Sequence, residues 1–307
     1  MPFDIVVPTI GRASLYDLLD SIARSSGELP GRVIVVDDRR DRREPLSLTR
    51  VAPRLRARVS VVAGKAAGPA SARNAGWRAS DAPHIAFLDD DVRVGEDWLQ
   101  RAAADARALA GTVAGSQAQL DVPLPPNRAP SDWERNVAGL SRAQWITADM
   151  IYRRDVLEQL DGFDERFKRA YREDSDFALR AVKAGFAIVR GSRRAVHPVR
   201  PADAWISVRL QAGNADDVLM RMLHGRSWRK AIGAGTGRWP LHLATVLCAA
   251  GWAALTAEFA LRRIAPGPRT AREIAAMVAT SAVIPFAAVY HRARAGAAFA
   301  FAQRGAQ

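Results

Sequence analysis

The sequence predicts an α/β protein with a mainly parallel β-sheet and helices on both faces. Short apolar runs alternate with stretches of helical periodicity through the first two thirds of the 307 residues, as they do in chains that build parallel sheets. Apolar residues make up 49% of the composition. That fraction supplies a core of ordinary size and excludes a disordered chain.

The expected elements follow the apolar runs in chain order. Strands are predicted at 3–7, 33–36, 59–62, 85–88 and 145–152, and helices at 15–25, 153–160 and 174–184. Valine and isoleucine are frequent in the first four strands, as is usual for strands. The segment 122–131 contains Pro123, Pro125, Pro126 and Pro130, so we expect it to be irregular and regard it as a candidate substrate lid.

The last third of the chain is basic and partly apolar. Residues 200–307 hold 14 Lys and Arg against five Asp and Glu, which is +9 of the formal net charge of +13. Two runs without Lys, Arg, Asp or Glu, 239–257 and 274–290, predict a helical hairpin near the lower limit of spanning length. Two interpretations stay open: the hairpin spans or lies on a membrane, or it is a soluble helical cap.

These patterns divide the chain into a domain at 1–200, a basic helical connector at 201–238 and the apolar hairpin at 239–307. The single cysteine, Cys248, excludes an intrachain disulfide and a cysteine-based zinc site. The N-terminus shows no signal-peptide pattern. We therefore expect a cytoplasmic protein, or one at the cytoplasmic face of the membrane. No nucleic-acid motif accompanies the basic charge, so nucleic acid is not an expected partner.

Three consecutive carboxylates, Asp89, Asp90 and Asp91, close the predicted strand 85–88. Adjacent carboxylates repel one another unless water or a cation compensates them. If the backbone stays extended, Asp89 and Asp91 point the same way, and such a pair suits Mg²⁺ or Mn²⁺ that also takes phosphate oxygens from a substrate. The alternative is an acidic turn that caps the next helix through Asp91 or Glu96.

A second acidic cluster, Glu173 and Asp174, opens the predicted helix 174–184. The helix dipole favours an ionised carboxylate at this end, which makes both residues candidates for a catalytic base. Capping of the helix is the alternative.

Polar groups also follow the other predicted strands, where ligands of open α/β sheets bind. The segment 64–76 is rich in glycine and small residues, which suits a diphosphate. The candidate side chains in these loops are Thr9, Arg12, Asp37, Asp38, Lys65 and Arg73.

Six motifs occur in a fixed order along the chain. They are Val6-Val-Pro-Thr-Ile-Gly-Arg12, Val35-Val-Asp-Asp38, Ala72-Arg-Asn-Ala-Gly76, Phe87-Leu-Asp-Asp-Asp91, Gly162-Phe-Asp-Glu165 and Arg172-Glu-Asp-Ser-Asp-Phe-Ala-Leu-Arg180. With these motifs, residues from about 4 to 197 resemble the family 2 glycosyltransferases with the GT-A (Rossmann-like) fold. The chain departs from that pattern after Asp38, where several arginines replace small polar residues, so the family's base and donor preference does not carry over.

The resemblance implies a role for each matching residue. Asp89 and Asp91 match the Asp-x-Asp motif for metal and diphosphate, and His197 falls where some members place a further metal or diphosphate contact. Asp174 matches the catalytic base, with Glu173 beside it. The substrate-binding residues implied or suggested by position are Thr9, Arg12, Asp37, Asp38, Arg73, Asp89 and Asp90.

The implied activity is a metal-dependent, inverting transfer of a sugar from a nucleoside-diphosphate sugar to a hydroxyl acceptor. The cofactor would be Mg²⁺ or Mn²⁺, and the acceptor a glycan or a lipid-linked molecule in cell-surface polysaccharide synthesis. Two other functions stay open from the residues alone. One is a nucleotidyl- or phosphotransferase with the same acidic metal site, and the other is a non-catalytic, membrane-associated scaffold.

Overall fold

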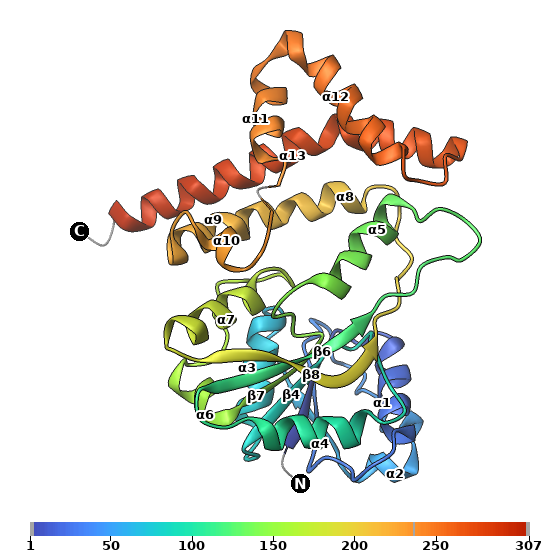
Figure 1. The fold of residues 1–307 in the computed structure, drawn as a ribbon, viewed down its shortest axis with the longest axis vertical. Coiled ribbons are helices and arrows are strands. Elements are labelled where there is room, and N and C mark those ends of the chain that lie inside the picture. Colours follow the sequence, from blue (N-terminus) through green and yellow to red (C-terminus); the bar gives the residue numbers. More distant parts are fainter. Residues whose placement is uncertain (1–2, 236, 305–307) are drawn as a thin grey trace. The chain divides into compact units, whose positions relative to one another are not determined.

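A computed structural model describes residues 3–235 and 237–304, and the chain forms two compact units. The sheet unit comprises Met1–Pro123 and Leu140–Pro198, and the helical unit comprises Leu124–Gly139 and Val199–Gln307. Figure 1 shows the strands gathered in the first unit and only helices in the second.

The sheet unit contains one eight-stranded sheet with the order β3-β2-β1-β4-β7-β6-β8-β5. Strands β1 to β4 run parallel, as do β6 and β8, whereas β7 is antiparallel to both of its neighbours. The predicted mixed, mainly parallel sheet is therefore confirmed. The strands are β1 Phe3–Thr9, β2 Val33–Asp37, β3 Val59–Ala63, β4 His84–Leu88, β5 Arg93–Val94, β6 Val113–Asp121, β7 Asp149–Arg153 and β8 Ala187–Val196.

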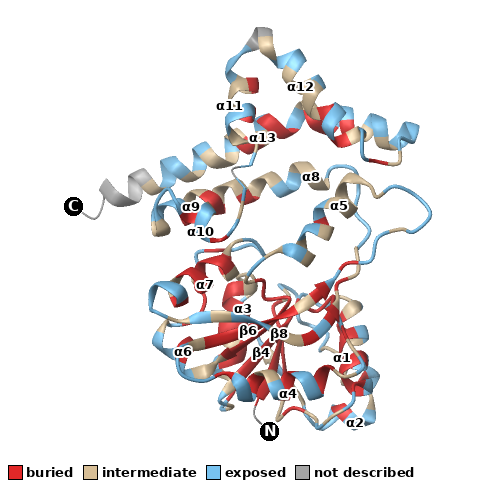
Figure 2. Ribbon diagram, viewed as in Figure 1, coloured by how far each residue is buried: buried red, intermediate tan, exposed pale blue. Residues whose placement is uncertain are grey.

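Helices cover both faces of this sheet, and each face has its own apolar core. Alternate residues of one strand enter opposite cores: Ile5 and Val7 pack with α1 and α4, and Val6 packs with α3 and α7. Figure 2 shows the central strands as mostly buried. The helices of this unit are α1 Ser14–Arg24, α2 Pro53–Arg56, α3 Pro69–Arg78, α4 Trp98–Ala108, α6 Arg154–Gln159 and α7 Glu173–Lys183.

Helix α3 corrects the sequence prediction, which treated 64–76 as a phosphate-binding loop. The loop ends at Gly68, and the helix begins at Pro69, a residue that suits a first helical position. Gly76 lets the helix approach the sheet, because a Cβ there would lie 2.3 Å from a Val6 methyl group and 3.0 Å from one of Val36. Arg73 is thus presented from a rigid helix.

Other elements were displaced or not predicted. Strand β7 begins at Asp149, four residues after the predicted start of that strand at 145. The elements α4, β5, β6 and β8 were not predicted. The proline-containing segment 122–130 has neither helix nor strand, as expected, and ends at Ser131, which caps α5 with a capping box.

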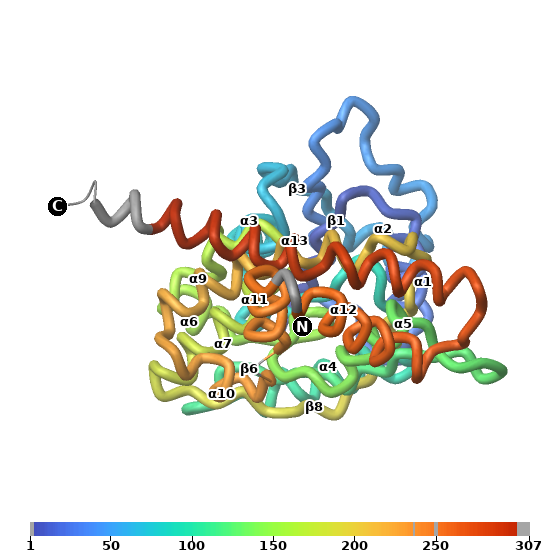
Figure 3. The backbone as a smooth tube through the Cα atoms, turned by 90° about the horizontal axis from the view of Figure 1, so that it is seen from above, coloured from blue at the N-terminus to red at the C-terminus, as the bar shows by residue number. Residues whose placement is uncertain are grey.

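The helical unit contains α5 Asp132–Ala138, α8 Ile206–Arg209, α9 Asn214–His224, α10 Trp228–Ala231, α11 Trp239–Leu247, α12 Ala249–Ile264 and α13 Ala271–Arg304. Its apolar part differs from the predicted hairpin in two ways. The run 239–257 is divided between α11 and α12 by Cys248, whose backbone is extended. The second helix is longer than predicted, and Figure 3 shows α13 running beside α11 and α12.

Helix α13 is the one helix in the described part of the chain that is long and apolar enough to cross a membrane by length and composition. The qualifying segment is Ala271–Phe299, and 33% of its most apolar window is buried in the protein. Core helices of soluble proteins meet the same criterion, so this observation alone assigns no location.

Candidate active site

Arg73 lies at the centre of the predicted site and joins its two acidic clusters. Arg73 is 2% exposed. Its Nη1 donates to Oε1 of Glu173 at 2.7 Å, and its Nη2 donates to Oδ1 of Asp89 at 2.9 Å. Burial opposes the charged form, but these two carboxylates raise the pKa of Arg73 above its ordinary value. The Arg73 guanidinium therefore connects the end of β4 to the start of α7.

The chain turns at Asp90 and Asp91 instead of staying extended. Asp90 is 1% exposed and is directed toward β1, where it accepts hydrogen bonds from Thr9 Oγ1 at 2.6 Å and Arg12 Nη1 at 2.7 Å. The middle carboxylate is thus satisfied within the protein. Its partners Thr9 and Arg12 are two of the predicted substrate-binding residues, and the structure brings all three together.

The helix-capping interpretation of the first cluster is wrong. Strand β5 follows the turn, and α4 begins only at Trp98. The residue before that helix is Asp97, and it makes no side-chain capping bond.

The outer carboxylates of this cluster have separate partners. Asp89 pairs with Arg73, whereas Oδ1 of Asp91 lies 3.5 Å from Nε2 of His197, which follows β8. Asp91 and His197 are 6% and 8% exposed. His197 Nδ1 has no hydrogen-bond partner among the described residues. The structure brings together two of the three predicted metal ligands.

This pair fits a divalent cation that takes its remaining ligands elsewhere. Mg²⁺ sites commonly use one or two protein carboxylates together with substrate phosphates and water, and imidazole is a further common metal ligand. Among residues 3–235 and 237–304, no group of three or more His, Cys, Asp or Glu is arranged to hold a metal alone. A cation held by Asp91 and His197 would thus depend on oxygens from a substrate.

Asp37 and Asp38, at the end of β2, differ in whether their carboxylate oxygens already have hydrogen-bond partners. Asp37 forms a two-point ion pair with Arg39, at 2.8 and 2.7 Å, which lowers the pKa of the carboxyl group. Asp38 accepts from the Gly68 backbone N–H at 2.9 Å through Oδ2. Its Oδ1 is buried and has no partner within the described residues. Asp38 therefore retains an acceptor that a ligand donor can satisfy.

Glu173 and Asp174 occupy the first turn of α7, after Arg172, whose φ is +77°. Arg172 is the N-cap and its side chain makes no capping bond. Asp174 instead satisfies the Ser175 backbone N–H in the first turn, so this carboxylate also stabilises the start of the helix, as the capping interpretation expected. Glu173 is 2% exposed, and its Oε2 has no partner in the described structure. Burial and the neighbouring Asp174 charge raise the pKa of Glu173 to about 7.

Asp174 is less enclosed than Glu173. Its Oδ1 accepts from the Ser175 backbone N–H at 2.6 Å and from the Ser175 hydroxyl at 3.3 Å. Burial raises the pKa of Asp174 despite the opposing effect of Arg73. A carboxylate with a raised pKa at an accessible position suits a proton acceptor near neutral pH.

Two positioning groups escaped the sequence analysis. The Asn74 side chain accepts from the Phe163 N–H at 2.9 Å and donates to the Phe163 carbonyl at 2.8 Å, which fixes the turn before α7. Arg193, 0% exposed on β8, donates to Asp149 at 2.7 Å and Ser116 at 2.6 Å. Asn74 belongs to the motif at 72–76, but no role was predicted for it, and no pattern in the sequence distinguished Arg193 from surface arginines.

Comparison with known families gives a match to "Glycosyl transferase family 2" over residues 4–174. This covers more than half of the 307 residues. The chain belongs to glycosyl transferase family 2. It is an enzyme that uses a nucleotide-sugar donor, which decides against the phosphotransferase and scaffold alternatives. No curated protein sequence matches the glycosyltransferase.

Solved structures support the GT-A-like fold of this glycosyltransferase. S. aureus TarS 1-349 in complex with UDP-GlcNAc has 16% identity and a TM-score of 0.50, with 95% of this chain and 90% of that chain covered. GalNAc-T7 with UDP, GalNAc and Mn²⁺ has 13% identity and a TM-score of 0.51, with 78% of this chain and 56% of that chain covered. At these identities the similarity concerns the fold alone.

Proposed function

We propose that the enzyme transfers a sugar from a nucleoside-diphosphate sugar to a hydroxyl acceptor in one metal-dependent, inverting displacement. The observation that carries this proposal is the double ion pair of Arg73 with Asp89 and Glu173, at 2.9 and 2.7 Å. It places the carboxylate cluster suited to a divalent cation with its bound diphosphate beside the carboxylates suited to accept a proton. A single displacement needs both on opposite sides of one reacting carbon.

On the donor side, Asp38 offers an unsatisfied buried acceptor to a base N–H. Asp91 and His197 would hold the divalent cation, Mg²⁺ or Mn²⁺. When bound, that cation would offset the negative charge that develops on the departing diphosphate. Thr9 and Arg12 act through Asp90, whose carboxylate they fix by hydrogen bonds.

On the acceptor side, Asp174 takes the proton from the attacking hydroxyl. We assign this role to Asp174 because Glu173 is nearly inaccessible and is bonded to Arg73. Glu173 sets the charge next to the base: its negative form repels a second negative charge and so favours protonation of Asp174. The proton transfer and the attack need no covalent enzyme intermediate.

The acceptor in this proposal is a glycan or a lipid-linked molecule of cell-surface polysaccharide synthesis, and the enzyme works at the cytoplasmic face of the membrane. UDP-GlcNAc is the first donor to test, because TarS, which shares the fold, was crystallised with it. The arginines that follow Asp38 argue for a panel of donors with different bases.

The test is a donor screen with purified full-length protein, Mn²⁺ or Mg²⁺, and a panel of nucleotide sugars. Release of a nucleoside diphosphate together with a product that contains a new glycosidic bond of inverted configuration supports the proposal. A retained configuration, or turnover that is unchanged by a metal chelator, would overturn the corresponding part of it. The Asp174→Asn variant is the inactive control.

A further inference from the structure

Helix α13 exposes an apolar face. Val278, Val283, Phe286 and Tyr290 are 51%, 39%, 47% and 57% exposed. Their spacing of five, three and four residues places them on one side of the helix. The sequence from 274 to 291 contains no Asp, Glu, Lys or Arg. An apolar strip of this length on the outside of a helix indicates a partner surface.

The opposite side of the same helix is polar and enclosed in the helical unit. Thr280 and Ser281 are 0% exposed, and each accepts a hydrogen bond from Arg263 Nη1, at 2.8 and 2.9 Å. Arg263 is 7% exposed and forms an ion pair with Asp132 at 2.7 Å. The buried side also carries the apolar residues Met277, Ile284 and Ala288, at 4%, 2% and 0% exposure. Helix α13 is therefore apolar on its exposed side as well, unlike a surface helix of a water-soluble protein.

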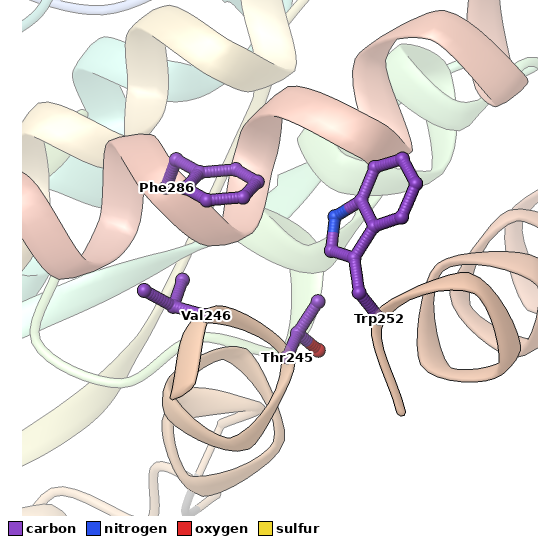
Figure 4. A pocket seen from close by; sticks show the side chains of 4 residues that line it. All are labelled: Thr245, Val246, Trp252 and Phe286. Carbon is purple, nitrogen blue, oxygen red and sulfur yellow. The ribbon is translucent and has the colours of Figure 1, made fainter. Parts of the chain in front are cut away.

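Helices α11 and α12 extend this apolar face. Thr245, Val246, Trp252 and Phe286 surround a hollow of about 290 Å³ between the three helices, and Figure 4 shows Phe286 and Trp252 on its rim. Leu247, at the end of α11, is 72% exposed. We call Trp252, Val278, Val283, Phe286 and Tyr290 the apolar surface.

The exposed charges of the helical unit are mostly positive, which favours a negatively charged partner surface. Of its Asp and Glu residues, all of which the structure describes, only Asp203 is exposed, and that residue pairs with Arg209 at 2.8 Å. By contrast, many basic residues of the unit are exposed to solvent. Exposed basic residues of the unit include Arg221, Arg226, Lys230, Arg262, Arg269, Arg272 and Arg294. Arg272 and Arg294 flank the apolar strip of α13 at its two ends.

We propose that the apolar surface lies flat on an anionic lipid bilayer, with α13 in the plane of the interface and the flanking arginines at the headgroups. Helices of this kind bind through buried apolar area together with attraction to anionic lipid. The proposal is independent of the sugar-transfer reaction, and it can fail or hold whether or not a donor is turned over.

The structure favours lying on the membrane over spanning it. If α13 crossed the bilayer, the Arg263–Asp132 pair would sit at the level of Thr280 and Ser281, near the middle of the hydrocarbon. Ionised groups are costly at that depth. The other predicted span is divided into α11 with 9 residues and α12 with 16, both shorter than the roughly 20 that a spanning helix needs.

The experiment is flotation of the full-length protein with vesicles. We expect binding to vesicles of phosphatidylglycerol and phosphatidylcholine, and weaker binding to phosphatidylcholine alone. The double variant Val283→Asp, Phe286→Asp should bind at least about tenfold less. Replacing Arg269, Arg272 and Arg294 by Gln should weaken binding roughly fivefold for each charge. Both sets of positions are at the surface, and circular dichroism verifies that the variants are folded.

The matched control is Val189→Asp, a change at an apolar residue of the sheet unit with 42% exposure, which should bind vesicles like the wild type. Equal binding of the wild type and the double variant, or no binding by the wild type, overturns the proposal. Protein that stays with the vesicles after alkaline carbonate washing indicates a spanning helix and overturns it as well. A dimer in light scattering that the double variant dissociates, without vesicle binding, assigns the surface to a second copy instead.

Discussion

The two acidic clusters of the sheet unit compensate their negative charge in different ways. At the end of β4, each carboxylate has its own polar partner: Asp89 has Arg73, Asp90 has Thr9 and Arg12, and Asp91 has His197. At the start of α7, Glu173 and Asp174 lie side by side, and burial disfavours their charge.

The difference separates two chemical tasks. A carboxylate that must bind a cation or a diphosphate complex works best if its charge is permanent and its position fixed. A proton acceptor works best if its pKa lies near the working pH. The first cluster has the properties of a binding site and the second those of a base. Arg73 belongs to both, so substitutions around it test whether the division is real.

The largest effect is expected at the base. Asp174→Asn should lower turnover by about 10²- to 10⁴-fold, because no carboxylate remains to take the proton from the acceptor hydroxyl. Donor binding should persist, because the first cluster is unchanged. Turnover is measured as released nucleoside diphosphate and binding by calorimetry. Asp161→Asn, a change at an exposed carboxylate in the turn before α7, is the matched control and should keep full activity. Parallel loss of binding and turnover would contradict the division.

Removing the Arg73 side chain, which pairs with both clusters, should lower the stability of the folded protein. Arg73→Met leaves Glu173 and Asp89 without their common partner, and breaking a buried ion pair costs about 3–5 kcal/mol. Urea unfolding measures the loss. Arg78→Met removes an exposed arginine of the same helix, whose ion pair with Asp161 is at the surface, and should cost less than about 1 kcal/mol. Equal losses of unfolding free energy in the two variants would show that the Arg73 ion pairs do not stabilise the two clusters.

The second cluster should also give the stability of the protein a characteristic pH dependence. The pKa of Glu173 is about 7 in the folded chain against an ordinary value of 4.5. Between these values the folded state holds the proton more tightly, so stability falls as pH rises, by roughly 3 kcal/mol for this group. Glu173→Gln should remove this contribution, which is measured as the difference between the two unfolding profiles from pH 4 to about pH 8.

The same variant should also remove one titration from the pH–rate profile. The Asp174 charge helps to raise the pKa of Glu173 to about 7, so Asp174 ionises while Glu173 is still protonated. Glu173→Gln should therefore leave the acidic limb in place and abolish any change in turnover near pH 7. A change near pH 7 that persists in the variant would show that it does not arise from Glu173.

The smallest effect is expected at the first cluster. Thr9→Val removes the hydroxyl that donates to Asp90 at 2.6 Å and leaves a buried carboxylate oxygen unsatisfied, which costs about 1–3 kcal/mol of stability. Thr9→Ser keeps the hydroxyl and is the control. Thermal unfolding measures both. Identical stabilities of the two variants would contradict the role of this hydrogen bond.

The central strands could be predicted from the sequence because they are buried on both faces. Strands β1, β2 and β4 contain nearly continuous apolar runs. Thr9 and Asp37 are the last residues of β1 and β2, and Asp89 directly follows β4. Strand β8 could not be found in this way, because it carries Arg190, Arg193 and Arg194. A buried arginine is stabilised by partners from other strands, and sequence periodicity does not report such partners.

The chemistry of the site was predictable in its residues and not in its pairings. The sequence indicated Asp89 to Asp91 as a unit, but the turn at Asp90 separates them because Thr9 and Arg12 hold the middle carboxylate. Arg73 was expected to bind substrate from a loop, whereas it lies on α3 and pairs with both clusters. Distances between residues remote in the chain depend on packing, and no local pattern encodes them.

The break between α11 and α12 has a practical consequence. Cys248 is the single cysteine of the chain, and it is exposed where the backbone leaves the helical conformation. A thiol-reactive dye would therefore label the native protein at one defined point, with no other sulfhydryl to remove first. Its emission colour would report, molecule by molecule, whether this corner of the protein is wetted by water or immersed in lipid.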